Sequence, residues 1–256
     1  MRYRARVEYD GTDFAGFQVQ PGRRTVQGEL EAALARLDPS GSSRVEAAGR
    51  TDAGVHATGQ VIAFTYRGRA SAVELGRALD ALLPMDVSIG RPIRVPDGFN
   101  PRFAARYREY RYTVWNGPRS PLRERQAFGV RDPLDVAAMA RAGSVLEGRH
   151  DFSAFGATGR SPVRTVHAVR VTRRGRIVTI DVTADSFLRG MVRRIVAVLL
   201  EVGLGEMNAT GVAAALVAGR PALDGASAPA QGLCLRRVVL GRPPLVDEVQ
   251  GEYGEP

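Results

Sequence analysis

The chain has 256 residues, 44% of them hydrophobic and 25% charged, which indicates one large globular unit or two closely packed domains and excludes a disordered or fibrous protein. Its formal net charge is +9, and all 36 basic residues are arginines. This excess of base favours a polyanionic partner such as nucleic acid over a membrane surface, although a generic basic soluble protein has the same composition.

Hydrophobic periodicity predicts six elements in the N-terminal part of the chain. Thr25 is the expected N-cap of the first helix, and Ser71 with Glu74 forms a capping box for the second. Together the elements have the order β-α-β-β-α-β, which is typical of ferredoxin-like and RNA-recognition domains. They are strand 2–9, helix 26–37, strands 44–48 and 60–66, helix 71–82 and strand 87–95.

The same order of elements is predicted a second time after residue 101. The repeat is one of architecture, since the two parts share no obvious sequence similarity. The elements are a strand around 110–114, a helix over 132–148, a hairpin of strands 164–172 and 177–184, helices 191–202 and 210–218, and a final strand 233–240.

We therefore predict an α+β fold of two ferredoxin-like, RRM-like β-α-β-β-α-β halves, with a continuous mixed sheet and a central cleft where loops from both halves converge. The predicted boundaries are 1–102 for the N-terminal half, which carries the catalytic aspartate loop described below, and 103–241 for the C-terminal half. Residues 242–256, with their prolines and acidic residues, are expected to form a loosely ordered tail.

The cellular compartment is predicted from three further features. No apolar run approaches the roughly 18 residues that a membrane span needs, and the N-terminus enters a strand pattern without a signal-peptide core. The single cysteine, Cys234, excludes an intrachain disulfide and a cysteine-based zinc site. We expect a cytoplasmic protein.

Residues 49–56 read Gly-Arg-Thr-Asp-Ala-Gly-Val-His and lie between two predicted strands. Glycines permit a tight turn or the close approach of a ligand, and the flanking strands hold the loop in place. We interpret the segment as an active-site loop with Asp52 as its reactive group. The alternative is a simple connection in which this aspartate caps a turn.

The sequence of residues 49–61 closely resembles the catalytic signature of the tRNA pseudouridine synthase A family. The resemblance implies an isomerase that converts uridine to pseudouridine in the anticodon stem-loop of tRNA, at tRNA positions 38, 39 and 40, with Asp52 as nucleophile. It also implies that no metal or organic cofactor takes part, and that a symmetric homodimer binds tRNA across both subunits. Further blocks that resemble the family lie at residues 9–18, 99–103, 108–112, 151–155, 164–165 and 187–193.

Pseudouridine formation detaches uracil from the ribose at N1, turns the ring and rejoins it through C5. The reaction needs a nucleophile or base beside the sugar, a way to hold the detached ring, and a pocket that excludes water. Asp52 supplies the first of these. The sequence leaves open whether its carboxylate attacks the ribose or removes a sugar proton.

Four other residues are candidates for supporting roles. The resemblance implies that Tyr110 contacts the target uracil and that Arg193 pairs with Asp52; a phenol can stack on a base, and a buried carboxylate needs a cation. Arg50 is expected to hold a phosphate or to fill the gap left by a flipped base, and His56 to pack beside the aspartate. The alternatives are a core aromatic for Tyr110, a solvated helix face for Arg193 and a structural role for His56.

The sequence departs from the family pattern at several positions. Arg189-Gly190 stand where the family usually has an aromatic residue or histidine, and Ala197 stands where it has glycine. Asp80 and Leu82 occupy places that asparagines usually fill. The departures at Arg189-Gly190 and Ala197 place local RNA contacts in question rather than the pairing of Arg193.

Two other functions fit part of the sequence. A metal-dependent nuclease would gather Asp10, Asp13 and Asp52 around two cations, but the chain has no metal-ligating histidine pair and no P-loop. A non-catalytic RNA-binding protein would use two recognition-type folds, but the aromatic sheet motif expected of such modules is absent.

Overall fold

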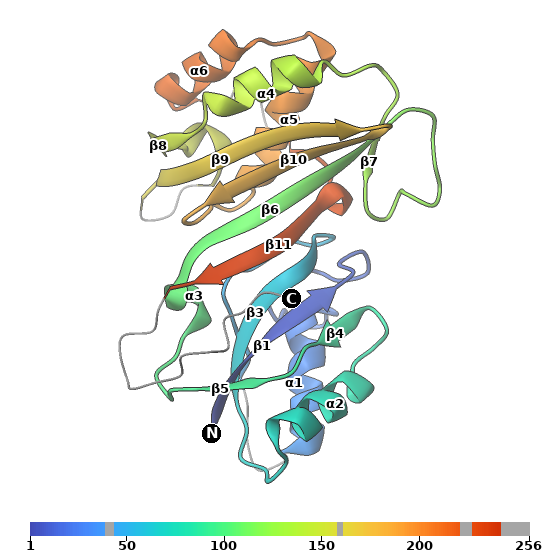
Figure 1. Ribbon diagram of the computed structural model, residues 1–256, viewed down its shortest axis with the longest axis vertical. Coiled ribbons are helices and arrows are strands. Elements are labelled where there is room, and N and C mark those ends of the chain that lie inside the picture. The colour runs from blue at the N-terminus through green and yellow to red at the C-terminus, as the bar shows by residue number, and fades with distance from the viewer. Residues whose placement is uncertain (39–43, 158–160, 221–226, 242–256) are drawn as a thin grey trace.

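The computed structural model describes residues 1–38, 44–157, 161–220 and 227–241. Within these ranges the strands form one 11-stranded mixed sheet, in which eight strands follow the order β4-β1-β3-β11-β6-β10-β9-β8. Figure 1 shows helices α1 and α2 at one end of the molecule and helices α4, α5 and α6 at the other, with β11 and β6 between them. The predicted α+β fold with a continuous mixed sheet is confirmed. The predicted tail lies outside the described residues.

The first half has the strand order β4-β1-β3-β2 expected of a ferredoxin-like unit. Its central strand β1 pairs antiparallel with β3, β4 and β5, and β2 pairs antiparallel with β3. The elements are β1 (Arg2–Tyr9), α1 (Val26–Leu37), β2 (Glu46–Ala47), β3 (His56–Thr65), α2 (Ala72–Leu82), β4 (Val87–Ile89) and β5 (Ile93–Val95).

The second half repeats this order as β11-β6-β10-β9, with β8 added at its edge and the short β7 beside β6. A four-residue helix, α3, leads into it, and two 3-10 turns, η1 and η2, connect later elements. The elements are α3 (Pro101–Ala104), β6 (Ala105–Asn116), β7 (Phe128–Val130), α4 (Val136–Ser144), β8 (Gly148–Asp151), η1 (Ser153–Phe155), β9 (Val163–Arg174), β10 (Ile177–Ala184), α5 (Met191–Leu204), α6 (Ala209–Ala218), η2 (Ala230–Gly232) and β11 (Leu233–Leu240).

The two halves join where β11 runs parallel to β3. Cys234 lies opposite His56, and Leu235 lies opposite Ala57. The backbones come so close here that a Cβ on Gly59 would collide with the carbonyl of Arg236. Glycine at this position therefore permits the junction of the two sheets.

Both predicted helix N-caps of the first half are confirmed. The Thr25 side chain accepts a hydrogen bond from the Gly28 amide at 3.2 Å. Ser71 and Glu74 form the reciprocal capping box. Asp80, one of the departures from the family pattern, accepts hydrogen bonds from the Ser88 hydroxyl and the Ile89 amide, both at 2.9 Å, and so ties α2 to β4.

Three strand predictions in the first half need correction. The strand expected over 87–95 is divided into β4 and β5, because Pro92 has no amide hydrogen and its ring packs against Gly76. The strand expected over 44–48 contains only β2, since the Val45 amide donates to the Glu31 side chain at 2.8 Å instead of a neighbouring strand. The strand expected from residue 60 begins four residues earlier, at His56.

Two helices in the second half also differ from the predictions. The helix expected over 132–148 is shorter, because Asp135 caps its N-terminus by accepting from the Ala138 amide at 2.8 Å, and β8 begins at Gly148. Helix α5 runs past Gly203, where a Cβ would collide with Met139 of α4. That glycine serves the packing of two helices, and the helix ends at Gly205, whose φ is +85°.

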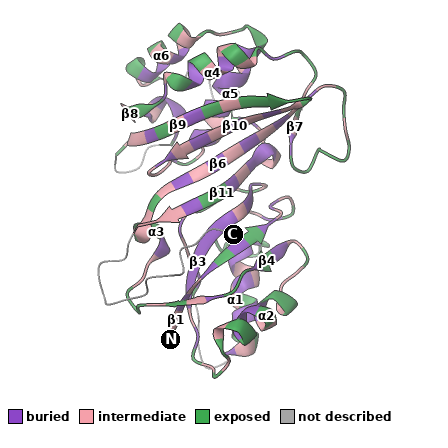
Figure 2. Ribbon diagram, viewed as in Figure 1, coloured by how far each residue is buried: buried purple, intermediate pink, exposed green. Residues whose placement is uncertain are grey.

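The core is continuous through both halves. Figure 2 shows β3 buried along most of its length, whereas the outer side of α2 is exposed. Tyr3 stacks on Phe64 with ring centroids 6.1 Å apart, and Tyr112 is fully buried in the second half. No helix in the described ranges is long and apolar enough to cross a membrane.

Candidate active site

The Asp52 loop, residues 48–55, connects β2 to β3, and its backbone is held at several points. The Thr51 carbonyl accepts from the Phe17 amide at 3.1 Å, and the Asp52 carbonyl accepts from the Val55 amide at 3.2 Å. The side chain of Gln60, fully buried in β3, donates to the Gly49 carbonyl at 2.8 Å. These contacts fix the backbone on both sides of the half-buried Asp52.

A buried hydroxyl pair lies beneath the loop. The Tyr9 hydroxyl and Thr51 Oγ1 are 2.8 Å apart, and both residues are buried. Burial raises the pKa of Tyr9, so its phenol remains neutral and able to donate. The pair anchors the residue directly before Asp52 to the end of β1.

The loop between β1 and α1 packs against the Asp52 loop. Gly16 has φ of +99°, and a Cβ there would press on the Thr51 carbonyl at 2.9 Å. From the opposite side, Ala230 of turn η2 approaches Gly54, where an added Cβ would lie 3.1 Å from the alanine Cβ. Asp52 is therefore bordered by segments of both halves.

Tyr110 reaches the same region from β6. It is buried, and its ring packs edge-on against Phe187 at a centroid distance of 5.2 Å. Its hydroxyl would lie 3.9 Å from a Cβ placed on Gly49, in the Asp52 loop. Burial raises the pKa of Tyr110 to about 12; the charge of Arg108 acts against this rise, and the charge of Asp52 adds to it. The structure thus brings Tyr110 and Asp52, from different halves, within electrostatic range of each other.

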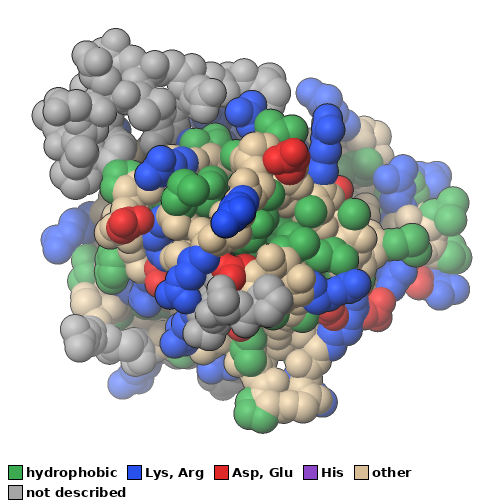
Figure 3. All heavy atoms as spheres, turned by 90° about the horizontal axis from the view of Figure 1, so that it is seen from below, with side chains coloured by type: hydrophobic (Ala, Val, Ile, Leu, Met, Phe, Trp, Pro, Cys, Tyr) green, Lys and Arg blue, Asp and Glu red, His purple; other side chains and the backbone are tan. Residues whose placement is uncertain are grey.

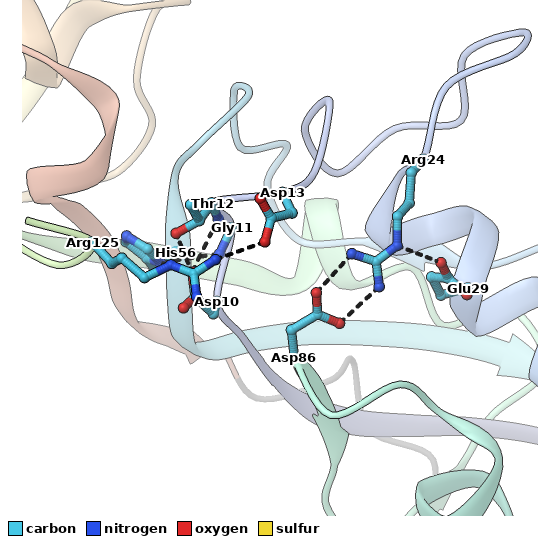
Figure 4. A network of polar contacts seen from close by, with 9 residues as sticks. All are labelled: Asp10, Gly11, Thr12, Asp13, Arg24, Glu29, His56, Asp86 and Arg125. Carbon is cyan, nitrogen blue, oxygen red and sulfur yellow. Dashed lines mark hydrogen bonds and ion pairs between the residues drawn. The ribbon is translucent and has the colours of Figure 1, made fainter.

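His56 begins β3 directly after the Asp52 loop. Its Nδ1 accepts from the Gly11 amide at 3.0 Å, and its Nε2 lies 3.1 Å from the Gln231 carbonyl. A neutral ring with its hydrogen on Nε2 satisfies both contacts, since that nitrogen then donates to the carbonyl. Asp10 Oδ1 is 3.2 Å from Nδ1 (Figure 4), but the amide hydrogen already occupies that nitrogen, so we favour the neutral ring over an ion pair. His56 therefore links the first loop to the second half.

The structure does not join Arg193 or Arg50 to Asp52. The Nε of Arg193 donates to the Ala228 carbonyl at 2.6 Å, and the Ala228 amide donates back to the Arg193 carbonyl at 3.0 Å. In the part of the chain that the structure describes, neither arginine forms an ion pair with the aspartate. Arg50 is exposed beside it.

Three residues that hold the site were not predicted from the sequence: Tyr9, Gln60 and Arg108. Arg108 is only 8% exposed, and it donates to the carbonyl of Ala48 at the start of the Asp52 loop. One signal was available, since a residue two positions before Tyr110 on a strand lies on the same face of the sheet.

The carboxylates proposed for a nuclease are not gathered together. Asp10 accepts from the amide and hydroxyl of Thr12; partial burial raises its pKa, and these hydrogen bonds outweigh that effect and lower it. Asp13 pairs instead with the exposed Arg125 at 2.7 Å (Figure 4). Among the described residues no three His, Cys, Asp or Glu side chains are placed to hold a metal ion. The arrangement gives the nuclease alternative no support.

Comparisons with known proteins cover most of the chain. A family model described as tRNA pseudouridine synthase matches residues 5–104 and 142–239. The protein named tRNA pseudouridine synthase A from Geobacter sulfurreducens is 43% identical over 238 residues, which cover 91% of this chain and 96% of the relative. Proteins of the same name from Moorella thermoacetica (44% over 240 residues; 91% and 96% covered) and Shouchella clausii (41% over 255 residues; 98% of each covered) are also similar.

The family match extends through both halves of the fold and includes the Asp52 loop and the helix that carries Arg193. Its description is that of a class of RNA-modifying enzymes. The chain belongs to the tRNA pseudouridine synthase family.

Proposed function

We propose that this chain is an isomerase that converts uridine to pseudouridine in the anticodon stem-loop of tRNA, with Asp52 as the catalytic nucleophile. The chain belongs to this family, and one observation supports the assignment most. Asp52 from the first half and Tyr110 from the second half lie in the same region of one sheet. No cofactor is required, because the reaction moves atoms within one nucleotide and changes no oxidation state.

The chemistry begins at the ribose. The bond between C1′ and uracil N1 breaks, the ring turns, and a bond forms between C1′ and C5; the proton on C5 leaves, and N1 gains one. The Asp52 carboxylate either attacks the sugar or removes a sugar proton to start this sequence. The held backbone around it keeps the carboxylate in one position relative to a bound nucleotide.

Tyr110 is proposed to contact the target uracil. Its phenol is neutral at physiological pH, because burial raises its pKa to about 12. A neutral phenol can pack against the ring and can exchange a proton with it after detachment. Its edge-on contact with Phe187 fixes the orientation of the ring.

The remaining site residues have supporting roles in this proposal. Exposed Arg50 holds a backbone phosphate or fills the space of the flipped base. Arg193 supplies positive charge from α5, and its bond to the Ala228 carbonyl positions its guanidinium. His56 supports the base of the Asp52 loop.

Two halves, 1–102 and 103–241, are proposed to bind one target nucleotide, and a cytoplasmic homodimer is proposed to hold the length of the tRNA. Figure 3 shows arginine side chains spread around the end of the molecule seen from below, among apolar and acidic side chains. A net charge of +9 supports a polyanionic substrate. Joined across a two-fold axis, such faces form one basic track.

The proposed activity is tested by measuring pseudouridine formation in tRNA. The protein is incubated with tRNA transcripts labelled with tritium at uracil C5, and both tritium release and the positions of pseudouridine are measured. Release from the anticodon stem-loop is expected, because the C5 proton must leave. Intact label, or cleavage of the RNA chain, would reject the proposal.

A second experiment concerns the assembly. Sedimentation at micromolar protein should show a dimer, and the tRNA Kd should rise steeply with salt because phosphate contacts release counterions. A fully active monomer would contradict the dimer. Binding that is indifferent to salt would contradict the basic track.

A further inference from the structure

The strongest unexplained feature of the structure is the buried guanidinium of Arg108. It lies in β6 at the junction of the two halves and is 8% exposed, yet its hydrogen-bond partners are all backbone carbonyls. It takes part in no ion pair in the described ranges of the chain. Burying an arginine without a carboxylate partner costs desolvation free energy, which indicates that this position serves a function other than stability.

The contacts of Arg108 join three segments. Nε and Nη2 donate to the Ala48 carbonyl at 3.2 and 2.7 Å, which is a forked contact with the base of the Asp52 loop. Nη1 donates to the Asp185 carbonyl at 2.7 Å, directly after β10, and Nη2 also donates to the Arg102 carbonyl at 3.0 Å in α3. Only a planar side chain with five donors makes this set of contacts from one position.

Tyr110, on the same strand as Arg108, also lies close to the Asp52 loop. Arg108 and Tyr110 are two residues apart in β6, so their side chains lie on one face of the sheet. A Cβ on Gly49 would be 3.9 Å from both Arg108 Nε and the Tyr110 hydroxyl. Gly49, three residues before Asp52, therefore lies close to both side chains.

We propose that Arg108 is a positioning residue, which fixes the separation between Asp52 and Tyr110 by clamping the base of the Asp52 loop to the strand that carries the tyrosine. The inference rests on the isomerase function proposed above. Arg108 is not proposed to touch a reacting atom. It acts through the Ala48 carbonyl, and Gln60 holds the next carbonyl, that of Gly49.

The test compares Arg108→Met, which removes every hydrogen bond, with Arg108→Lys, which keeps the charge but loses the fork. Arg106→Met is the matched control, since Arg106 is an exposed arginine on the same strand. The measured quantity is the single-turnover rate constant at saturating enzyme, with enzyme in excess over tRNA. That constant does not depend on the fraction of enzyme that is correctly folded.

Arg108→Met should lower this rate constant about 10- to 100-fold, the size expected when reacting groups are misplaced by about 1 Å. Arg108→Lys should fall between Met and wild type, and Arg106→Met should keep the wild-type constant. The tRNA Kd of both Arg108 variants should stay near that of wild type.

A purely structural role would lower Tm and leave the rate constant unchanged in both Arg108 variants, and that result would overturn the proposal. A loss seen only in tRNA Kd would overturn it as well. If Arg108→Met does not fold, a wild-type constant for Arg108→Lys is sufficient to reject it. Wild-type protein that makes no pseudouridine would instead reject the proposed function, so the two failures are distinct.

Discussion

His56 Nε2 lies 3.1 Å from the carbonyl oxygen of Gln231, and this contact ties the first strand after the Asp52 loop to the turn before β11. The same ring accepts from the Gly11 amide through Nδ1. One neutral imidazole thus satisfies two backbone groups from opposite halves of the molecule. These two contacts give His56 a structural role at the junction of the two halves.

The first prediction follows from this contact. His56→Ala leaves the Gly11 amide and the Gln231 carbonyl without their partner, so the free energy of unfolding should fall by about 2 to 4 kcal/mol. Urea unfolding measures the loss. His150→Ala is the control, because His150 makes its hydrogen bond to Glu147 at an exposed site and its removal should cost little. A variant of wild-type stability with no activity would point to a catalytic role for His56 instead.

The second prediction concerns the proposed nucleophile. Asp52→Asn keeps the shape of the side chain and removes its charge, so pseudouridine formation should fall by several orders of magnitude while tRNA affinity changes little. Asp13→Asn makes the same change in the neighbouring loop, where the ion pair with Arg125 is exposed, and should leave the rate close to wild type. Activity of Asp52→Asn within about tenfold of wild type would exclude the aspartate as nucleophile.

The third prediction separates the two properties of Tyr110. Tyr110→Phe keeps the ring and its packing on Phe187, so it should bind tRNA normally and react more slowly. Tyr110→Ala should also weaken binding, since stacking on a base contributes roughly 1 to 3 kcal/mol. Binding and single-turnover assays on the two variants distinguish these effects. Wild-type behaviour on tRNA combined with lower Tm in both would make Tyr110 a core residue only.

The fourth prediction is a dependence of stability on pH. Burial raises the pKa of Tyr110 from 10.0 to about 12, so folding favours the protonated phenol. This stabilisation is fully present below pH 10 and is lost as pH rises from 10 toward 12, at a slope of up to about 1.4 kcal/mol per pH unit. Tyr110→Phe should show a shallower decline than wild type. If wild type and Tyr110→Phe lost stability with equal slopes in urea unfolding at pH 9 to 11, the Tyr110 phenol would have an ordinary pKa. Burial also raises the pKa values of Tyr9 and Tyr112, but both residues remain in the variant and contribute equally to the two slopes.

The fifth prediction concerns metal removal. With tRNA folded beforehand, the single-turnover rate should be the same in excess EDTA as in its absence, because the proposed reaction uses only Asp52 and Tyr110. Parallel circular dichroism of the tRNA controls for loss of its own fold. Strict dependence of the chemical step on a divalent cation would favour the metal-dependent alternative, which uses the aspartates of the first loop, Asp10 and Asp13.

The sequence predicted most helices and strands because their periodicity is local. The capping box of Ser71 and Glu74 and the alternation in residues 2–9 depend on neighbouring residues alone. The elements that were missed depend on distant partners. Strand β7 exists because Phe128 pairs with Val114 of β6, and no local pattern encodes that contact.

The candidate site was predicted in part, through the resemblance of the Asp52 and Tyr110 segments to a known family. The residues that hold these two in place were not predicted. Arg108 stands in a strand with two further arginines, Arg106 and Arg111, so its sequence does not show which of the three is buried. Gln60 stands in a largely apolar strand. Burial decides the role of both, and burial depends on how the two halves pack.

The position of β11 between β3 and β6 has a consequence for synthesis of the protein. It is the last strand in the described chain, and it alone connects the sheet of the first half to that of the second. When the ribosome has synthesised both Asp52 and Tyr110, it has not yet made β11. The strands that hold these two residues are therefore not yet joined. We therefore expect the candidate site to assemble only after translation has reached the end of β11.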